Sequence, residues 1–281
     1  MKHEIVLETN YLKHLEFSKW YFELFFKATN VTISYHEFPL NSLFQQMKRD
    51  HLVRGHQFGD LMFFKFNNKL VALDSWSHCK YLEPMHTRGF FNNLDIDLYI
   101  KLDETEQVRK WLGYKTTSWV MFPGGKSFTN SFRWENKQHK YLSMFTTGRH
   151  SMRTMHRGAW YNFCKNNPRY YTIDHNRLPE SEYGAVLKQC QFGLCVSHNG
   201  YKNTREYEFI SNHMPFVLNY CPRYDFEFIP NKHFIYVTKP EDLAAIETID
   251  LTHFAAASKQ IWDDYYEPNA AVSYLDRLLN Q

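Results

Sequence analysis

The chain has 281 residues, of which 43% are hydrophobic and 22% are charged, and its formal net charge is +3. This composition suffices for a full hydrophobic core and excludes disordered, collagen-like and low-complexity chains. The near balance of 33 basic and 30 acidic residues argues against a surface built as a whole for nucleic acid or anionic membrane. Any anion-binding site is therefore expected to be local.

Several classes of protein are excluded by what the sequence lacks. No window approaches the roughly 18 consecutive apolar residues of a membrane span, and the N-terminus lacks a signal-peptide core, so we expect a soluble, cytoplasmic protein. The five cysteines form no CxxC pair and stand in apolar or aromatic surroundings, which predicts buried thiols in a reducing compartment. The glycine-dependent signatures of dehydrogenases, P-loop NTPases and α/β-hydrolases are absent, as are HExxH and zinc-finger spacings.

The first half alternates apolar strands with amphipathic stretches. The strands and helices of this half are predicted from apolar alternation and from turn residues. The polar segment 126–140 that follows them is the predicted linker. The expected strands are 4–7, 31–35, 60–66, 69–73, 97–101 and 118–122, and the expected helices are 12–28 and 40–54.

The second half alternates strands and helices at short intervals, which predicts βαβ units and a mainly parallel sheet. In such sheets ligands lie beyond the carboxyl ends of the strands, so a site is expected just after Thr147 and Ser197, after Leu73, and near 8–14. The expected strands are 141–147, 170–173, 192–197, 216–219 and 234–237, and the expected helices are 152–165, 182–189, 204–212 and several from 241 to the end.

A local basic island lies between Glu135 and Asp174, where no acidic residue occurs. Arg149, Arg153 and Arg157 recur every four residues, so they share one face if a helix begins near Ser151. A strand end, Gly148, arginines and free helix amides together suit a diphosphate. The alternative interpretation is a solvated basic face.

A second polar constellation, residues 197–208, follows the apolar strand at 192–197. Thr204 is a plausible helix N-cap, and Arg205 and Glu208 fall three apart on one helical face. A carboxylate there suits a ribose diol, which needs an acceptor for two hydroxyls. An ordinary surface ion pair with a capping box is the alternative.

The segment 141–280 is similar to the nucleotide-binding domain of GT-B glycosyltransferases, and more loosely to phage DNA β-glucosyltransferases and exostosin-like and group 1 enzymes. The resemblance rests on the Gly-Arg turn at 148–149, on Leu-Lys-Gln-Cys-Gln-Phe-Gly-Leu-Cys-Val leading to Thr-Arg-Glu-Tyr-Glu, and on Met-Pro-Phe-Val at 214–217. It implies an α/β fold with two Rossmann-like domains facing a cleft. These are an acceptor-side domain, 1–137, and a nucleotide-sugar-binding domain, 138–281, whose last helix could cross back to the first.

The resemblance also implies roles for individual residues. Arg149 and Arg153 would hold the donor diphosphate, Arg205 would assist at the phosphate or ribose, and Glu208 would hold the ribose hydroxyls. Glu206 stands so close to Glu208 that the choice between the two carboxylates stays open. The glycine-rich loop of many members is replaced by Thr-Asn-Tyr at 9–11. The predicted donor-binding residues are Gly148, Arg149, Arg153, Thr204, Arg205 and Glu208.

The predicted catalytic base is Asp74, which follows an expected strand. An inverting transferase needs a carboxylate there, within reach of the acceptor hydroxyl, and the phage enzymes carry an aspartate after a comparable strand. A turn-forming Asp-Ser pair is the alternative, and His14 and His78 are rival bases. Asp95-Ile96-Asp97 could hold a divalent ion as in GT-A glycosyltransferases, but it precedes a strand, where acids are mostly solvated.

We therefore expect metal-independent transfer of a sugar from a nucleotide-sugar, such as a UDP-sugar, to a glycan or another hydroxyl acceptor, with no resident cofactor. One alternative is a non-catalytic nucleotide- or glycan-binding protein on the same fold. The other is a protein that binds or modifies nucleic acid through the basic island at 149–169.

Overall fold

The computed structural model of the chain divides into two units, which comprise residues 1–121, 223–226 and 265–281, and residues 122–222 and 227–264. The predicted domain boundary between residues 137 and 138 lies outside the described residues and stays a prediction. Within the described part, no helix is long and apolar enough to cross a membrane. The structure describes residues 2–8, 25–37, 39–40, 61–74, 94–101, 110, 113, 115–118, 134, 140–146, 155–173, 178–196, 204–222 and 224–281.

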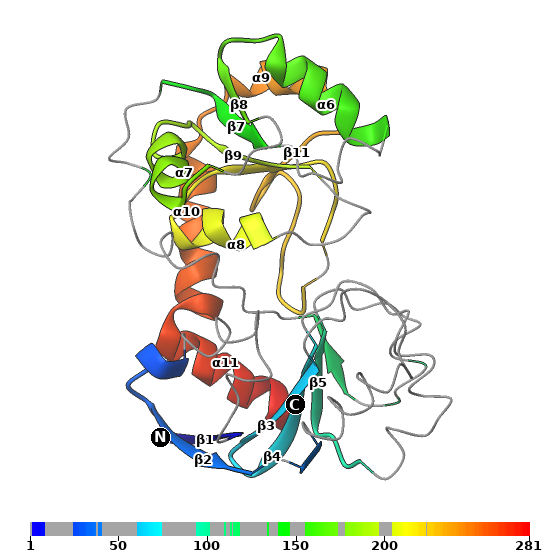
Figure 1. Cartoon of the computed structure of the whole chain (residues 1–281), viewed down its shortest axis with the longest axis vertical. Coiled ribbons are helices and arrows are strands. Elements are labelled where there is room, and N and C mark those ends of the chain that lie inside the picture. Colours follow the sequence, from blue (N-terminus) through cyan, green and yellow to red (C-terminus); the bar gives the residue numbers. More distant parts are fainter. Residues whose placement is uncertain are drawn as a thin grey trace. The chain divides into compact units, whose positions relative to one another are not determined.

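The first unit contains a mixed six-stranded sheet in the order β2-β1-β3-β4-β5-β6. β3 is antiparallel to β1 and β4, and the other neighbours are parallel (Figure 1). Five predicted strands are confirmed, whereas most of 118–122 lies outside the described residues. The strands are β1 His3–Glu8, β2 Val31–His36, β3 Leu61–Phe66, β4 Lys69–Asp74, β5 Leu98–Lys101 and β6 Thr116–Thr117.

A two-residue turn explains why this sheet is mixed. Asn67 and Asn68 join β3 to β4 with φ angles of 48° and 64°. Asparagine tolerates this left-handed conformation, and a turn with two positive φ angles forces an antiparallel hairpin. The other five strands run in one direction, so their carboxyl ends share one edge of the sheet. Glu8, Asp74 and Lys101 end three of those strands, and all three are buried.

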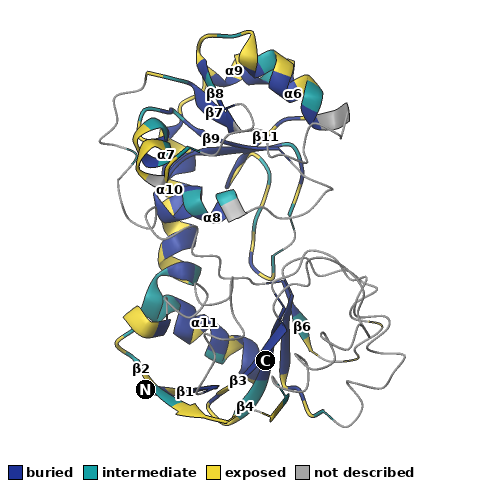
Figure 2. Ribbon diagram, viewed as in Figure 1, coloured by how far each residue is buried: buried dark blue, intermediate teal, exposed yellow. Residues whose placement is uncertain are grey.

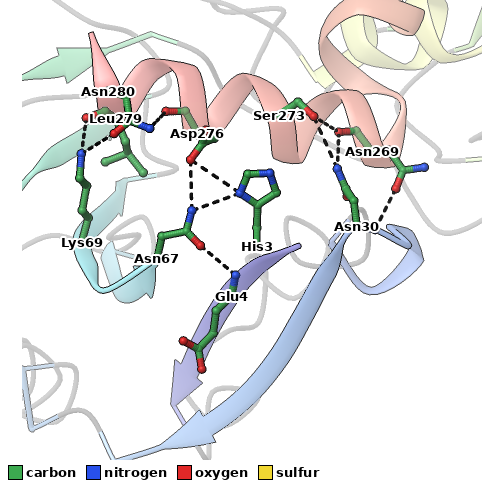
Figure 3. A network of polar contacts seen from close by, with 10 residues as sticks. All are labelled: His3, Glu4, Asn30, Asn67, Lys69, Asn269, Ser273, Asp276, Leu279 and Asn280. Atoms are coloured by element: carbon green, nitrogen blue, oxygen red, sulfur yellow. Dashed lines mark hydrogen bonds and ion pairs between the residues drawn. The ribbon is translucent and has the colours of Figure 1, made fainter. Parts of the chain in front are cut away.

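The last helix, α11 (Pro268–Asn280), belongs to the first unit. Its buried apolar residues recur at spacings of three and four, which gives one face to the core (Figure 2). Polar contacts tie the helix to the strands (Figure 3): Asn67 Nδ2 donates to Asp276 Oδ1 at 3.1 Å, and Lys69 Nζ donates to the Leu279 carbonyl at 2.7 Å. These bonds join the β3–β4 hairpin to a helix that lies about 200 residues later in the sequence.

The second unit is built on parallel strands. Backbone bonds from Gln191 to Tyr141 and from Phe192 to Leu142 join the two small sheets of this unit, so the spatial order is β8-β7-β9-β10-β11. This doubly wound order confirms the predicted parallel sheet. The strands are β7 Ser143–Thr146, β8 Tyr170–Ile173, β9 Gly193–Cys195, β10 Phe216–Leu218 and β11 Ile235–Tyr236.

Helices flank these strands, with α6 and α9 on one side and α8 on the other (Figure 1). Trp160, Leu194, Val217 and Phe254 belong to one buried core, as expected for helices that cover a sheet. The described helices are α6 Met155–Lys165, α7 Glu180–Leu187, α8 Thr204–Ser211, the 3₁₀ helix Pro240–Asp242, α9 Leu243–Ile246 and α10 Thr252–Ile261. The π-helix Trp262–Tyr266 follows α10, and its last two residues belong to the first unit.

The cysteines correct one expectation. Cys164, Cys190 and Cys195 are buried free thiols, as predicted, but Cys221 is exposed. It follows β10 in an irregular segment beside Pro222, where its apolar neighbours in sequence do not cover it. Cys79 lies outside the described residues.

Candidate functional site

The topology of the second unit singles out the carboxyl ends of β7 and β9. These strands are neighbours in space, but the chain leaves β7 toward β8 and leaves β9 toward β10. Crossovers that diverge in this way leave a switch point, which is where doubly wound sheets bind ligands. α6 follows β7 and α8 follows β9. Among the described residues, the cations at these two positions are Arg157, in the first turn of α6, and Arg205, in the first turn of α8.

Arg157 is a buried cation with an unmet hydrogen bond. Its side chain is 8% exposed, and its Nε has no hydrogen-bond partner within the described part of the chain. The guanidinium carbon lies 5.9 Å from the centre of the Phe145 ring. Burial, and next the positive charge of Arg205, lower the pKa of Arg157. Two neighbouring guanidinium groups with a donor left unpaired make an anion the natural complement.

Glu206 belongs to the interior. It is 1% exposed, and the Tyr220 hydroxyl donates to its Oε1. The Cys195 sulfur lies 3.5 Å from the same hydroxyl, and burial raises the pKa of Cys195 to about 12, so the thiol stays protonated. The carboxylate of Glu206 is therefore committed to this buried network, which leaves Glu208 as the carboxylate available to a ligand.

Glu208 is half-buried and lies beside Arg205 and Tyr183. The Tyr183 hydroxyl donates to Glu208 Oε2 at 2.9 Å, and the guanidinium carbon of Arg205 lies 6.0 Å from the Tyr183 ring centre. Burial raises the pKa of Glu208, while the charge of Arg205 and the hydrogen bond from Tyr183 act in the opposite direction. An arginine and a carboxylate thus stand together on one face of α8, as their spacing predicted.

Only some of the predicted donor-binding residues lie in the described part of the chain. Gly148, Arg149 and Arg153 lie outside the described residues, on the stretch of sequence between β7 and α6. α8 begins at Thr204, whose side chain also lies outside the described part. In the sequence, Arg157 stood out only as the last of three arginines that recur every four residues. Tyr183 carried no signal, because it reaches the site from α7, more than twenty positions before Glu208.

Asp74 lies at the carboxyl end of β4, in the first unit, with no exposed surface. Its Oδ2 accepts a hydrogen bond from the Tyr99 hydroxyl at 2.7 Å and pairs with Lys101 Nζ at 3.1 Å. This buried ion pair gives Asp74 a structural role inside the sheet. The rival bases His14 and His78 lie outside the described residues.

The Asp-x-Asp pattern has ordinary structural contacts. Asp97 Oδ2 accepts the Leu70 backbone N–H at 2.7 Å, and Asp95 is exposed. Among the described residues, no group of three His, Cys, Asp or Glu side chains could hold a metal ion. In the basic island, Arg169 forms an ion pair with Glu247, and Lys165 Nζ donates to the Tyr161 hydroxyl at 3.0 Å.

No protein-family model and no curated protein matches the sequence. Similar solved structures include the pneumococcal O-GlcNAc transferase GtfA in complex with UDP and GlcNAc, with TM-score 0.39 and 13% identity over 71% of this chain and 47% of that one. TarM has a TM-score of 0.43 and 12% identity over 96% of this chain and 57% of TarM. An α1,3-fucosyltransferase has a TM-score of 0.37 and 12% identity over 98% of this chain and 90% of the fucosyltransferase chain. This chain spans about half the length of the first two. Such scores assign no family, so the function is inferred from the geometry.

Proposed function

We propose that this protein transfers a sugar from a nucleotide-sugar donor to a hydroxyl acceptor without a metal. The observation that carries the proposal is the buried Nε of Arg157, which has no hydrogen-bond partner among the described residues and lies beside Arg205 at the switch point of a doubly wound sheet. A diphosphate would satisfy that donor and neutralise both guanidinium groups. Glu208 would accept the ribose hydroxyls, and the predicted Gly148, Arg149 and Arg153 would complete the phosphate site.

The chemistry follows from this charge distribution. In the transfer, the acceptor oxygen bonds to the anomeric carbon while the bond from that carbon to the diphosphate oxygen breaks. The hydroxyl proton passes to a base, and the departing nucleoside diphosphate keeps the electron pair. Arginines fixed in a water-poor setting stabilise that growing negative charge in the transition state, the task that a metal ion performs elsewhere.

Asp74 is the proposed base. Because it also pairs with Lys101 inside the sheet, its carboxylate reaches an acceptor only if the residues that cover it move. A loss of turnover in Asp74→Asn is evidence for a base only when the variant keeps the thermal stability of the wild type. We expect a folded Asp74→Asn variant to bind the donor normally and to lose transfer.

The donor site is tested by calorimetric titration of UDP, GDP and ADP in EDTA. We expect one of them to bind, and Arg157→Met and Arg205→Met each to weaken it about tenfold or more, because each loses a charge-assisted hydrogen bond. Arg169→Gln is the matched control, since Arg169 lies half-exposed against Glu247, and it should bind as the wild type does. Equal affinity in all four proteins would contradict the proposal.

The same proteins separate the proposal from the nucleic-acid alternative. A protein that uses the basic island should bind duplex DNA with an affinity that falls steeply with salt, and Arg169→Gln should weaken that binding. Such a result, together with no binding of any nucleoside diphosphate, would replace the proposed function. Nucleotide binding that depends on Arg157, without transfer of any sugar, would favour the non-catalytic alternative.

A further inference from the structure

Tyr183 contacts both ligand-facing groups of α8 from a different helix. It stands in the first turn of α7, where its backbone N–H bonds to the Pro179 carbonyl at 2.9 Å. Its hydroxyl donates to Glu208, and its ring lies beside the Arg205 guanidinium. One side chain therefore contacts both an arginine and a carboxylate of α8, and its hydroxyl holds the carboxylate by a hydrogen bond.

In the hydrogen bond between Tyr183 and Glu208, the phenol is the donor and the carboxylate is the acceptor. Burial, and next the negative charge of Glu208, hold the pKa of Tyr183 well above its usual value, so the phenol stays a donor to the carboxylate. Within the described part of the chain, the charged and titratable groups that act on Glu208 are Tyr183 from α7 and Arg205 from its own helix. Cys195 of β9 acts on Tyr183 and Arg205, and the charge of Arg205 acts on Arg157 of α6.

A fixed carboxylate matters most to a vicinal diol. A carboxylate offers about four lone-pair sites, so the bond from Tyr183 leaves capacity for two sugar hydroxyls. A ribose binds through both hydroxyls only when the carboxylate is ionised and correctly rotated. A 2′-deoxyribose makes a single bond and tolerates rotation. The hydroxyl of Tyr183 should therefore contribute more to the binding of ribonucleotides than to that of 2′-deoxyribonucleotides.

We infer that Tyr183 is a positioning residue that sets the preference of this site for ribonucleotides by orienting Glu208. The inference rests on the proposed function, because it takes the ligand to be a nucleoside diphosphate. It adds a specificity determinant that acts through Glu208 without touching the reacting atoms.

The test compares UDP, GDP and ADP with their 2′-deoxy counterparts by calorimetry in wild type and Tyr183→Phe. We expect the ribonucleotide preference of the wild type to fall about tenfold in the variant, because one hydrogen bond to a charged group is lost, with the affinity for the 2′-deoxy form nearly unchanged. Glu208→Asp, which withdraws the carboxylate from Tyr183, should have the same effect. The matched control is Tyr170→Phe, which changes a buried tyrosine of the same unit.

A pH series adds a measurement that a purely structural role would not move. Without the hydrogen bond, nothing from Tyr183 offsets burial, so the pKa of Glu208 rises further. Ribonucleotide affinity should then be lost at a higher pH in Tyr183→Phe than in the wild type as the pH falls.

Two outcomes separate this inference from the proposed function. If a nucleotide binds in an Arg157-dependent manner but Tyr183→Phe keeps the full ribonucleotide preference and the wild-type pH profile, the role of Tyr183 is refuted while the donor site stands. If the wild type has no ribonucleotide preference, the inference is refuted in the same way. If no nucleoside diphosphate binds to the wild type, the proposed function and the inference fail together.

Discussion

Lys101→Met is expected to lower the free energy of unfolding by about 3–5 kcal/mol, because it leaves a buried carboxylate without this cation. Lys101 and Asp74 are register partners on the parallel strands β5 and β4, and neither side chain has exposed surface. The Tyr99 hydroxyl continues to donate to Asp74 but brings no positive charge. Urea unfolding, followed by a spectroscopic probe of the first unit, measures the change.

The double variant Lys101→Met with Asp74→Asn should recover part of that loss, because it removes both buried charges together. The matched control is Lys232→Met, which breaks an ion pair of similar length with Glu227 on the surface; solvent screening makes such pairs weak, so its unfolding should barely change. A Lys101→Met protein as stable as the wild type would contradict a stabilising role of the Asp74–Lys101 contact in this sheet.

Gly193→Ala is expected to destabilise the second unit by about 3 kcal/mol, near the upper end of the range for overpacked cores. A Cβ on Gly193 would stand 2.5 Å from three atoms of the Phe209 ring. That ring is 2% exposed and packs against Phe216 with centroids 6.2 Å apart, so it cannot move without disturbing the core. Because Phe209 lies on α8, the same displacement should weaken the proposed binding of a nucleotide by Arg205 and Glu208.

Two further proteins distinguish a steric cause from the loss of a glycine as such. Gly158→Ala on α6 places a Cβ in open space, so its melting temperature should stay unchanged or rise, as for a glycine replaced inside a helix. Gly193→Ala combined with Phe209→Leu should regain part of the lost stability, because the smaller side chain yields room. Equal melting temperatures for Gly193→Ala and the wild type would show that β9 and α8 are not packed this closely.

The strands were largely predictable because each carries its own apolar signal. β1, β3, β4 and β8 coincide with the expected segments to within about two residues, the usual uncertainty of element ends. The direction of β3 depended on a turn of two asparagines with positive φ angles. The exposure of Cys221 depended on how the chain after β10 is packed, which the apolar character of neighbouring residues does not determine.

The site was predictable as far as its residues are close together in sequence. Arg205 and Glu208 share a helix, so their spacing indicated a common face. The choice between Glu206 and Glu208 required the position of Tyr220, which comes from another strand end and holds Glu206 in the interior. Tyr183 and the burial of Arg157 likewise result from packing between separate elements. Such long-range contacts leave no periodic pattern in a single sequence.

The binding of a nucleoside diphosphate at the carboxyl ends of β7 and β9 is tested most directly by a crystal structure of the protein with the nucleotide that binds in calorimetry. We expect a phosphate oxygen within hydrogen-bonding distance of Arg157 Nε and the ribose hydroxyls on Glu208. A nucleotide bound elsewhere, with the Arg157 guanidinium still buried and without an anion, would contradict the proposed donor site.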